Sequence, residues 1–198
     1  MTRILRRVRF KRINIKLLLA MPGLILGLIG LLGSIWLGVD FADLPAEILF
    51  FAALTAFFTI AFLSAFFERF IPSFTFAGGM LEGIMQGLGL NGLWAFFLAL
   101  TSSLGEELFF RGFLLALGVK FLPVWLAVLA QAAVFAAFHP APARAWGYPL
   151  WTALVGVVLA GVTLACGSVE PAILAHYLFN HLNLNQAILP RVSTQNGS

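Results

Sequence analysis

The sequence predicts an all-α protein: a polytopic transmembrane helix bundle of about six spans, with a cytoplasmic N-terminus and a polar site inside the bundle. Of its 198 residues, 61% are hydrophobic and 10% are charged, whereas a soluble globular domain carries about 25% charged residues. Apolar stretches of the roughly 20 residues that cross a bilayer recur along the chain. The composition therefore excludes an ordinary soluble domain, and it excludes intrinsic disorder, which requires few apolar residues.

The chain opens with a basic segment, residues 1–16, which holds seven of the twelve basic residues and no acidic one. We interpret it as a cytoplasmic topology signal that binds anionic lipid head groups, and we expect no nucleic-acid partner. The apolar run 17–39 is too long for a cleaved signal peptide and predicts an uncleaved first span. One domain covers residues 17–190, and residues 191–198 form a short polar tail.

Each further span follows from loop signals around an apolar stretch. Acidic residues with Pro45 end the first span, Glu68-Arg69 ends the second, and Pro123 separates the third from the fourth. Pro140 and Pro142 mark the break between the fourth and fifth spans. The stretch from Gly167 to Pro171 marks the break between the fifth and sixth. The expected helices are 17–39, 48–67, 92–118, 121–138, 149–166 and 171–189. A backbone in lipid must satisfy its own hydrogen bonds, which favours helix in each of them.

Basic residues also predict the orientation. With the N-terminus inside, ten basic residues lie in cytoplasmic segments and only Lys120 lies outside, as the positive-inside rule requires. We expect the plasma (inner) membrane of a prokaryote. The glycine-rich stretch 78–91 has apolar residues at helical spacing and predicts a short interfacial helix, either a connector or a gate. Gly156 and Ala160 predict a close helix contact, and the five tryptophans predict interfacial belts.

Ionisable residues stand where lipid should exclude them. A charge in mid-membrane costs at least about 2.5 kcal/mol, yet the third span contains Glu106, Glu107 and Arg111. Glu107 and Arg111 are four residues apart, which predicts a structural ion pair. Glu106 points about 100° away and has no partner on its own helix. An unpaired carboxylate in an apolar medium accepts a proton readily, as a general base must.

The fourth and sixth spans add imidazoles to this carboxylate. His176 and Asn180 are four residues apart on one face of the sixth helix, where both can donate to an oxyanion. His139, at the end of the fourth span, would share a water molecule with Glu106. This chemistry suits hydrolysis of an amide or ester, and a peptide in the membrane is the natural substrate. For His139 to meet His176, we expect the sixth helix to begin partway through the bilayer.

The three motifs, Glu-Glu-x-x-x-Arg, Phe-x-x-x-His and His-x-x-x-Asn, occur in this order on separate spans. Together they resemble the CAAX-protease and bacteriocin-processing family, which includes the Ras-converting prenyl-protein endopeptidases. The resemblance covers the core at residues 92–189. It implies an intramembrane endopeptidase in which Glu106 and His139 hold the water, His176 and Asn180 face the oxyanion, and Glu107 and Arg111 complete the first motif. His181 lies outside the pattern and receives no role.

The resemblance also implies a membrane-embedded or lipid-anchored peptide as substrate. The family is often catalogued as metalloproteases, although a metal-free glutamate mechanism has been argued for it. We expect no required cofactor; in the zinc alternative, Glu106, His139 and His176 would be the ligands, a set seen in catalytic zinc sites. Two other functions stay open: a small transporter, and a non-catalytic binding or immunity protein that uses the same pocket.

Overall fold

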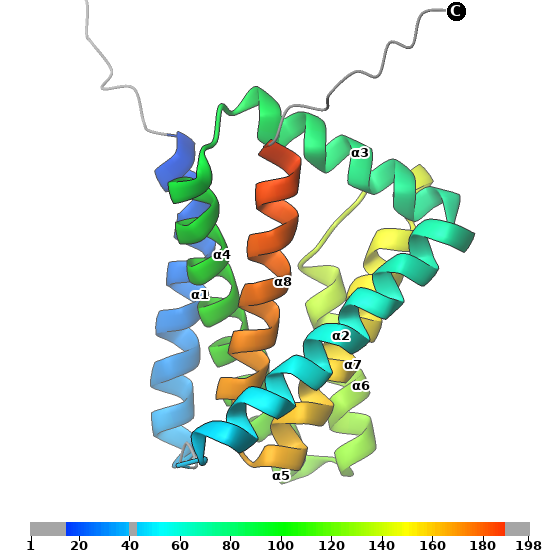
Figure 1. The fold of residues 1–198 in the computed structure, drawn as a ribbon. Helices are drawn as coiled ribbons and strands as arrows, with labels where there is room; N and C mark the ends of the chain where they lie inside the picture. Colours follow the sequence, from blue (N-terminus) through cyan, green and yellow to red (C-terminus); the bar gives the residue numbers. More distant parts are fainter. Residues whose placement is uncertain (1–14, 40–42, 189–198) are drawn as a thin grey trace, which may run out of the picture.

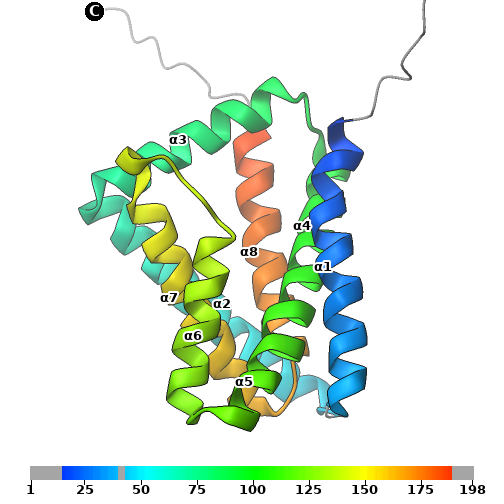
Figure 2. The same ribbon diagram turned by 180° about the vertical axis from the view of Figure 1, so that it is seen from behind.

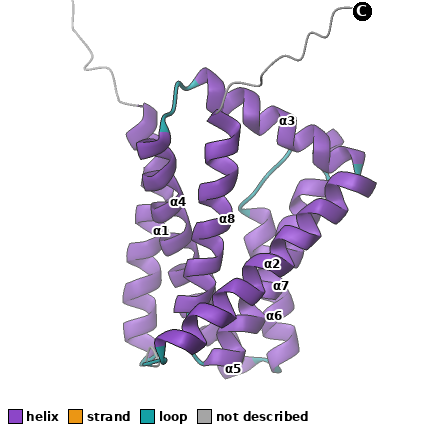
Figure 3. Cartoon of the chain, in the orientation of Figure 1, coloured by secondary structure: helices purple, strands orange, loops and turns teal. Residues whose placement is uncertain are grey.

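The computed structural model describes residues 15–39 and 43–188, and all regular structure in this part of the chain is helical (Figure 3). The predicted class, an all-α polytopic bundle, is confirmed. Most of the basic segment 1–16 and the whole tail 191–198 lie outside the described residues, so their proposed roles stay predictions. The interaction of the N-terminus with anionic lipids is among them.

The observed elements follow the predicted spans within a few residues. They are α1 (Ile15–Leu37), α2 (Ala46–Phe70), α3 (Pro72–Gly87), α4 (Gly92–Glu107), the π-helix η1 (Leu108–Leu115), α5 (Ala116–Phe121), α6 (Val124–Ala137), the 3-10 turn η2 (Ala143–Ala145), α7 (Gly147–Cys166) and α8 (Glu170–Ile188). The segment from α4 through α5 is continuous and corresponds to the predicted third span.

The helices differ in how well they suit lipid. Among the described residues, four helical segments are long and apolar enough to cross a membrane: α1, α2, α4 to α5, and α7. Helix α6 is apolar but has only 14 residues. Helix α8 has 19 residues and packs against α2, α3, α4 and α7. Because protein surrounds α8, it tolerates the polar side chains that make it the least apolar of the predicted spans.

Apart from α3, which lies across one end of the bundle, and with α4 to α5 taken as one segment, successive helices run in alternating directions (Figure 1). The start of α1, helix α3, the turn η2 and the end of α8 lie at one end of the bundle, and α5 lies at the other (Figure 1). Side-chain contacts agree with this arrangement: Arg144 of η2 lies over the ring of Phe76 in α3. At the opposite end, Lys120 Nζ donates to the Leu37 carbonyl over 3.1 Å. The predicted grouping of the loops on two sides is therefore present in the fold.

The interfacial helix predicted at 78–91 is α3, which starts earlier, at Pro72, and ends at Gly87. Proline suits the first turn of a helix because it fixes φ and needs no amide partner there. Gly89 then adopts a φ of 57°, and Asn91 Oδ1 accepts from the Trp94 amide over 3.1 Å to cap α4. Helix α3 crosses the end of the bundle (Figure 1).

Glycines allow α1 to pack directly on the helix that carries Glu106. A Cβ at Gly105 would overlap the backbone of Gly23, and a Cβ at Gly30 would overlap the backbone of Leu108. A second pair of helices, α6 and α7, also packs closely. A Cβ at Gly156 of α7 would lie 3.1 Å from Ala132 of α6. The close helix contact predicted from Gly156 is confirmed. In a membrane, such approaches gain van der Waals packing that lipid does not supply.

Candidate active site

Helices α2, α4, α6, α7 and α8 surround a partly enclosed cavity of about 110 Å³ in the interior of the bundle. All four residues predicted to be catalytic line it: Glu106 from α4, His139 from the segment after α6, and His176 and Asn180 from α8. The remaining lining residues come mainly from α7; they are Ile60, Ser102, Phe135, Tyr148, Trp151, Thr152, Val155 and Phe179. The folded chain therefore brings together the polar residues that the sequence separates.

Glu106 is the carboxylate at the centre of this group. Its side chain is 16% exposed, and its Oε2 atom is buried and has no hydrogen-bond partner within the described part of the chain. His139 Nε2 lies 3.7 Å from this oxygen, and His176 Nε2 lies 4.0 Å from it. Both separations exceed a direct hydrogen bond. One carboxylate oxygen and two imidazole nitrogens thus surround the same small volume.

Glu107 has one partner more than the sequence predicted. Its fully buried Oε1 accepts from Arg111 over 2.8 Å, which confirms the predicted ion pair. The same oxygen lies 2.7 Å from His176 Nδ1. Arg111 also donates to the Gly156 carbonyl of α7 over 3.3 Å. The pair therefore joins α4, α7 and α8, and it fixes the ring of His176 as well as neutralising buried charge.

The partners of the two rings define what each ring offers to Glu106. His139 Nδ1 lies 2.8 Å from the Phe135 carbonyl, which can only accept, so we assign the ring hydrogen to Nδ1. His176 Nδ1 faces the Glu107 carboxylate, which also accepts, so we assign the hydrogen of this ring to Nδ1 as well. In its neutral form, each ring therefore presents Nε2 as an acceptor toward Glu106. Three acceptors around one volume suit a water molecule, which can donate two hydrogens.

The histidines converge because α6 is short. Its 14 residues span about 21 Å, against about 29 Å for the 19 residues of α8, at 1.5 Å per residue. Figure 2 shows that α6 ends below the level of α3 and that a loop continues upward from it. His139 lies at this break, inside the bundle. Helix α8 begins at Glu170, one residue earlier than the predicted span, and its start partway through the bilayer stays a prediction.

Two residues that the sequence analysis did not single out support the predicted site from α4 and α7. Ser102 Oγ accepts from Asn180 Nδ2 over 3.2 Å, and the position of Ser102 four residues before Glu106 is the signal that identifies it. Tyr148 lies against His139, with ring centroids 6.2 Å apart. His181, which received no role, stacks on Tyr177 instead and does not line the cavity.

Trp151 also lines the cavity, contrary to the belt expected for the five tryptophans. Its side chain is 9% exposed, whereas Trp36, Trp125 and Trp146 are 75%, 64% and 55% exposed. The sequence signal is its position between Tyr148 and Thr152, two polar residues four apart in an otherwise apolar helix. One face of α7 therefore belongs to the site, and the other faces outward.

A catalytic zinc ion needs three ligating side chains around one point. Within residues 15–39 and 43–188, no group of three or more His, Cys, Asp or Glu side chains is arranged to hold a metal ion. The ligand set of the zinc alternative, Glu106 with His139 and His176, is not such a group.

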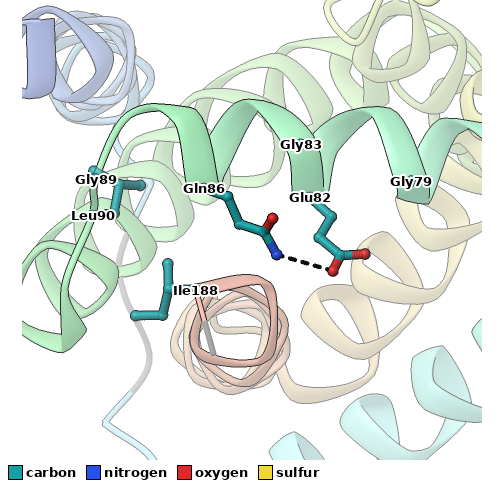
Figure 4. Close-up of a pocket in the computed structure, with 7 residues that line it drawn as sticks. All are labelled: Gly79, Glu82, Gly83, Gln86, Gly89, Leu90 and Ile188. Atoms are coloured by element: carbon teal, nitrogen blue, oxygen red, sulfur yellow. Dashed lines mark hydrogen bonds between the residues drawn. The ribbon is translucent and has the colours of Figure 1, made fainter. Parts of the chain in front are cut away.

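A second, more open hollow of about 700 Å³ lies between α3 and the end of α8 (Figure 4). Its polar side chains are Glu82 and Gln86, and Gln86 Nε2 donates to Glu82 Oε1 over 3.1 Å. Glycines and the apolar Leu90 and Ile188 form the rest of its lining. Its lining contains no imidazole, so the residues predicted to be catalytic lie only in the smaller cavity.

A helical bundle with apolar spans and a buried carboxylate between two imidazoles defines an integral membrane protein with a hydrolase-like site. Residues 89–182 match the family described as "Type II CAAX prenyl endopeptidase Rce1-like". This match contains all three motifs and confirms their resemblance to the CAAX-protease family, and it points to a peptidase. No curated protein and no solved structure shows a significant match to the chain.

Proposed function

We propose that this protein is an intramembrane endopeptidase that hydrolyses a peptide bond of a membrane-associated substrate with a water molecule activated by Glu106. The observation that carries the proposal is the position of Glu106 Oε2, buried, without a partner among the described residues, and 3.7 and 4.0 Å from the Nε2 atoms of His139 and His176. A structural carboxylate in such surroundings would be paired.

In the proposed reaction, a water molecule donates one hydrogen to Glu106 and the other to His139 Nε2. As the water oxygen attacks the carbonyl carbon of the substrate, Glu106 takes the proton, which is general-base catalysis. The protonated Glu106 then gives this proton to the leaving nitrogen. The C–N bond breaks, a C–O bond forms, and the products are a carboxylic acid and an amine.

The oxyanion of the tetrahedral intermediate needs hydrogen-bond donors of its own. Asn180 Nδ2 carries two hydrogens, of which Ser102 accepts one; the other is available to an oxyanion. His176 Nε2 can donate only when the ring is protonated. The Glu107 carboxylate, 2.7 Å from Nδ1, stabilises such an imidazolium, as the buried aspartate of a serine-protease triad does.

The location of the cavity limits the substrate class. It lies inside a bundle whose outer surface is apolar, and this supports a membrane-embedded or lipid-anchored peptide as substrate. The proposal includes the plasma (inner) membrane of a prokaryote and a cytoplasmic N-terminus, which the distribution of basic residues favours.

Purified protein incubated with a membrane-anchored peptide tests the proposal. We expect the wild-type protein to cleave the peptide and Glu106→Gln to lose activity by about 10²- to 10⁴-fold, the usual contribution of a general base. Gln keeps the size of the side chain, so the variant should unfold at the same temperature. Mass spectrometry of the products identifies the cleaved bond. The matched control is Glu82→Gln, which lies outside the cavity.

The same experiment separates the other functions. Cleavage that persists undiminished in Glu106→Gln would remove Glu106 from the reaction. Absence of cleavage in the wild-type protein, over a range of anchored peptides, would instead favour a transporter or a non-catalytic binding protein. Transport or binding that depends on Glu106 would then identify which.

Treatment with a chelator tests the metal-free form of the mechanism. We expect cleavage by the purified protein to continue after EDTA or 1,10-phenanthroline and dialysis, because Glu106 and water suffice for the proposed steps. Peptide cleavage is measured before treatment, after treatment and after addition of Zn²⁺. Loss of activity that Zn²⁺ alone restores would make the zinc alternative correct, with Glu106, His139 and His176 as ligands.

A further inference from the structure

The indole of Trp151 carries a donor that the protein itself does not use. Trp151 lies in the second turn of α7 and lines the cavity together with Glu106, His176 and Asn180. Its Nε1 atom is buried and has no acceptor among the described residues. The indole nitrogen is a donor only, and a buried donor without an acceptor is a net cost to folding.

Packing holds this indole in one orientation. The Tyr148 ring stacks on it at 6.0 Å between centroids, and the Phe74 and Phe179 rings lie 5.5 Å away. A phenylalanine at 151 would make similar apolar contacts without burying an unpartnered N–H group. Packing in the free protein therefore does not explain why residue 151 carries a buried N–H group, and an acceptor from outside the chain would explain it.

The other cavity residues show which partner this donor fits. Glu106 and the neutral His139 present acceptors, Thr152 Oγ1 already donates to the Tyr148 carbonyl over 2.9 Å, and one Asn180 hydrogen goes to Ser102. A peptide that enters the cavity loses the water bound to its main-chain carbonyl groups and needs donors in return. Trp151 Nε1 makes no hydrogen bond to the described residues, so its hydrogen is available to such a carbonyl group.

We propose that Trp151 Nε1 donates a hydrogen bond to a main-chain carbonyl oxygen of the bound substrate, next to the bond that is cleaved. This rests on the proposed peptidase function and makes Trp151 a substrate-positioning residue. The bond forms on binding and persists through the reaction, so it lowers KM and leaves kcat nearly unchanged.

The test combines one protein substitution with single changes in the peptide. Amides near the cleaved bond, but not that bond, are replaced one at a time by esters, whose carbonyl groups are weaker acceptors. With the all-amide peptide, we expect Trp151→Phe to raise KM about tenfold and to change kcat by less than about twofold. At one ester position the wild-type KM should rise, and the Trp151→Phe KM should not. The control, Trp125→Phe, alters an indole that is 64% exposed and should behave as wild type.

Each outcome decides one question. Trp151→Phe with a wild-type KM, or with wild-type sensitivity to every ester, overturns the role of Trp151 while leaving the peptidase proposal intact. A wild-type protein that cleaves no peptide overturns the peptidase proposal, and the inference fails with it. If Trp151→Phe does not fold, the ¹⁵N-indole resonance of Trp151 in Glu106→Gln decides: a downfield N–H shift with added peptide supports the bond, and an unchanged position overturns it.

Discussion

At the scale of single residues, Glu107 is the residue on which the geometry of the site depends. One of its oxygens accepts from both Arg111 and His176, while Arg111 lies 4.4 Å above the Phe135 ring. Taking both charges out of water is costly, and mutual attraction offsets that cost only while both partners are present. Glu107 thus connects the stability of the bundle to the orientation of an imidazole in the cavity.

Removal of one partner should therefore cost more than removal of both. We expect Arg111→Met to destabilise the protein by about 3–5 kcal/mol, because the buried Glu107 charge loses its compensation. The double variant Glu107→Gln/Arg111→Met should recover a substantial part of that loss. Denaturant titration in detergent micelles measures both. Equal destabilisation of the single and the double variant would show that the ion pair is not energetically coupled.

The double variant also tests the positioning role of Glu107. Without the carboxylate, the imidazolium form of His176 is no longer stabilised, so kcat should fall while KM stays near its wild-type value. A folded double variant with wild-type kcat would limit Glu107 to a structural role.

At the scale of elements, α1 supports the site although it lies outside the segment that matches the family, residues 89–182. Its glycines lie against α4 and η1, and the residue in closest approach, Gly105, directly precedes Glu106. The π-helix η1 begins one residue after Glu107, and π-helical turns are frequent at functional sites. The position of Glu106 thus depends on a helix–helix contact that only glycine permits.

A single methyl group at this contact should disturb both stability and activity. We expect Gly105→Ala to cost about 1–3 kcal/mol, the usual range for overpacking, because its Cβ would overlap the Gly23 backbone. Activity should fall as well, since α4 must move to relieve the overlap. Thermal unfolding in micelles and peptide cleavage measure the two effects.

The matched control for this substitution is Gly161→Ala. A Cβ at Gly161 of α7 has no atom within 4 Å, so the variant should be at least as stable as the wild type, because alanine favours a helix interior over glycine, and it should keep wild-type activity. If Gly105→Ala is as stable and active as this control, the contact between α1 and α4 tolerates separation, and α1 does not position Glu106.

At the scale of the whole molecule, the chain crosses the bundle in alternating directions and its loops fall into two groups at opposite ends (Figures 1 and 2). Arg69 and Arg144 lie in the group with α3, whereas Glu47 and Lys120 lie in the other group. The charge distribution predicts that the group with α3 faces the cytoplasm.

Cysteine labelling tests this orientation. In a Cys166→Ser background, which removes the single native cysteine, we expect Lys120→Cys to react with a membrane-impermeant maleimide on intact cells. Ala143→Cys, next to Arg144, should react only after permeabilisation. Gel-shift labelling of the two variants measures the difference. The reverse pattern would invert the topology and place the basic N-terminus outside.

The amino-acid sequence by itself determined the helices, their order and which polar residues line the cavity. Continuous apolar runs leave the backbone no alternative to helix in lipid, and ionisable residues within such runs are too costly to be incidental. Even the Glu107–Arg111 pair is local, because both residues lie on one helical segment. The start of α3 at Pro72 was missed, since a glycine-rich stretch gives a weak boundary signal.

Only the tertiary structure decided how the site is assembled. The early end of α6 brings His139 to Glu106, the Glu107–His176 contact joins residues 69 positions apart, and Trp151 faces the cavity although it reads as an interfacial tryptophan. These features depend on the relative heights and rotations of packed helices. Such quantities are set by side-chain contacts between distant segments, and no periodicity within one segment encodes them.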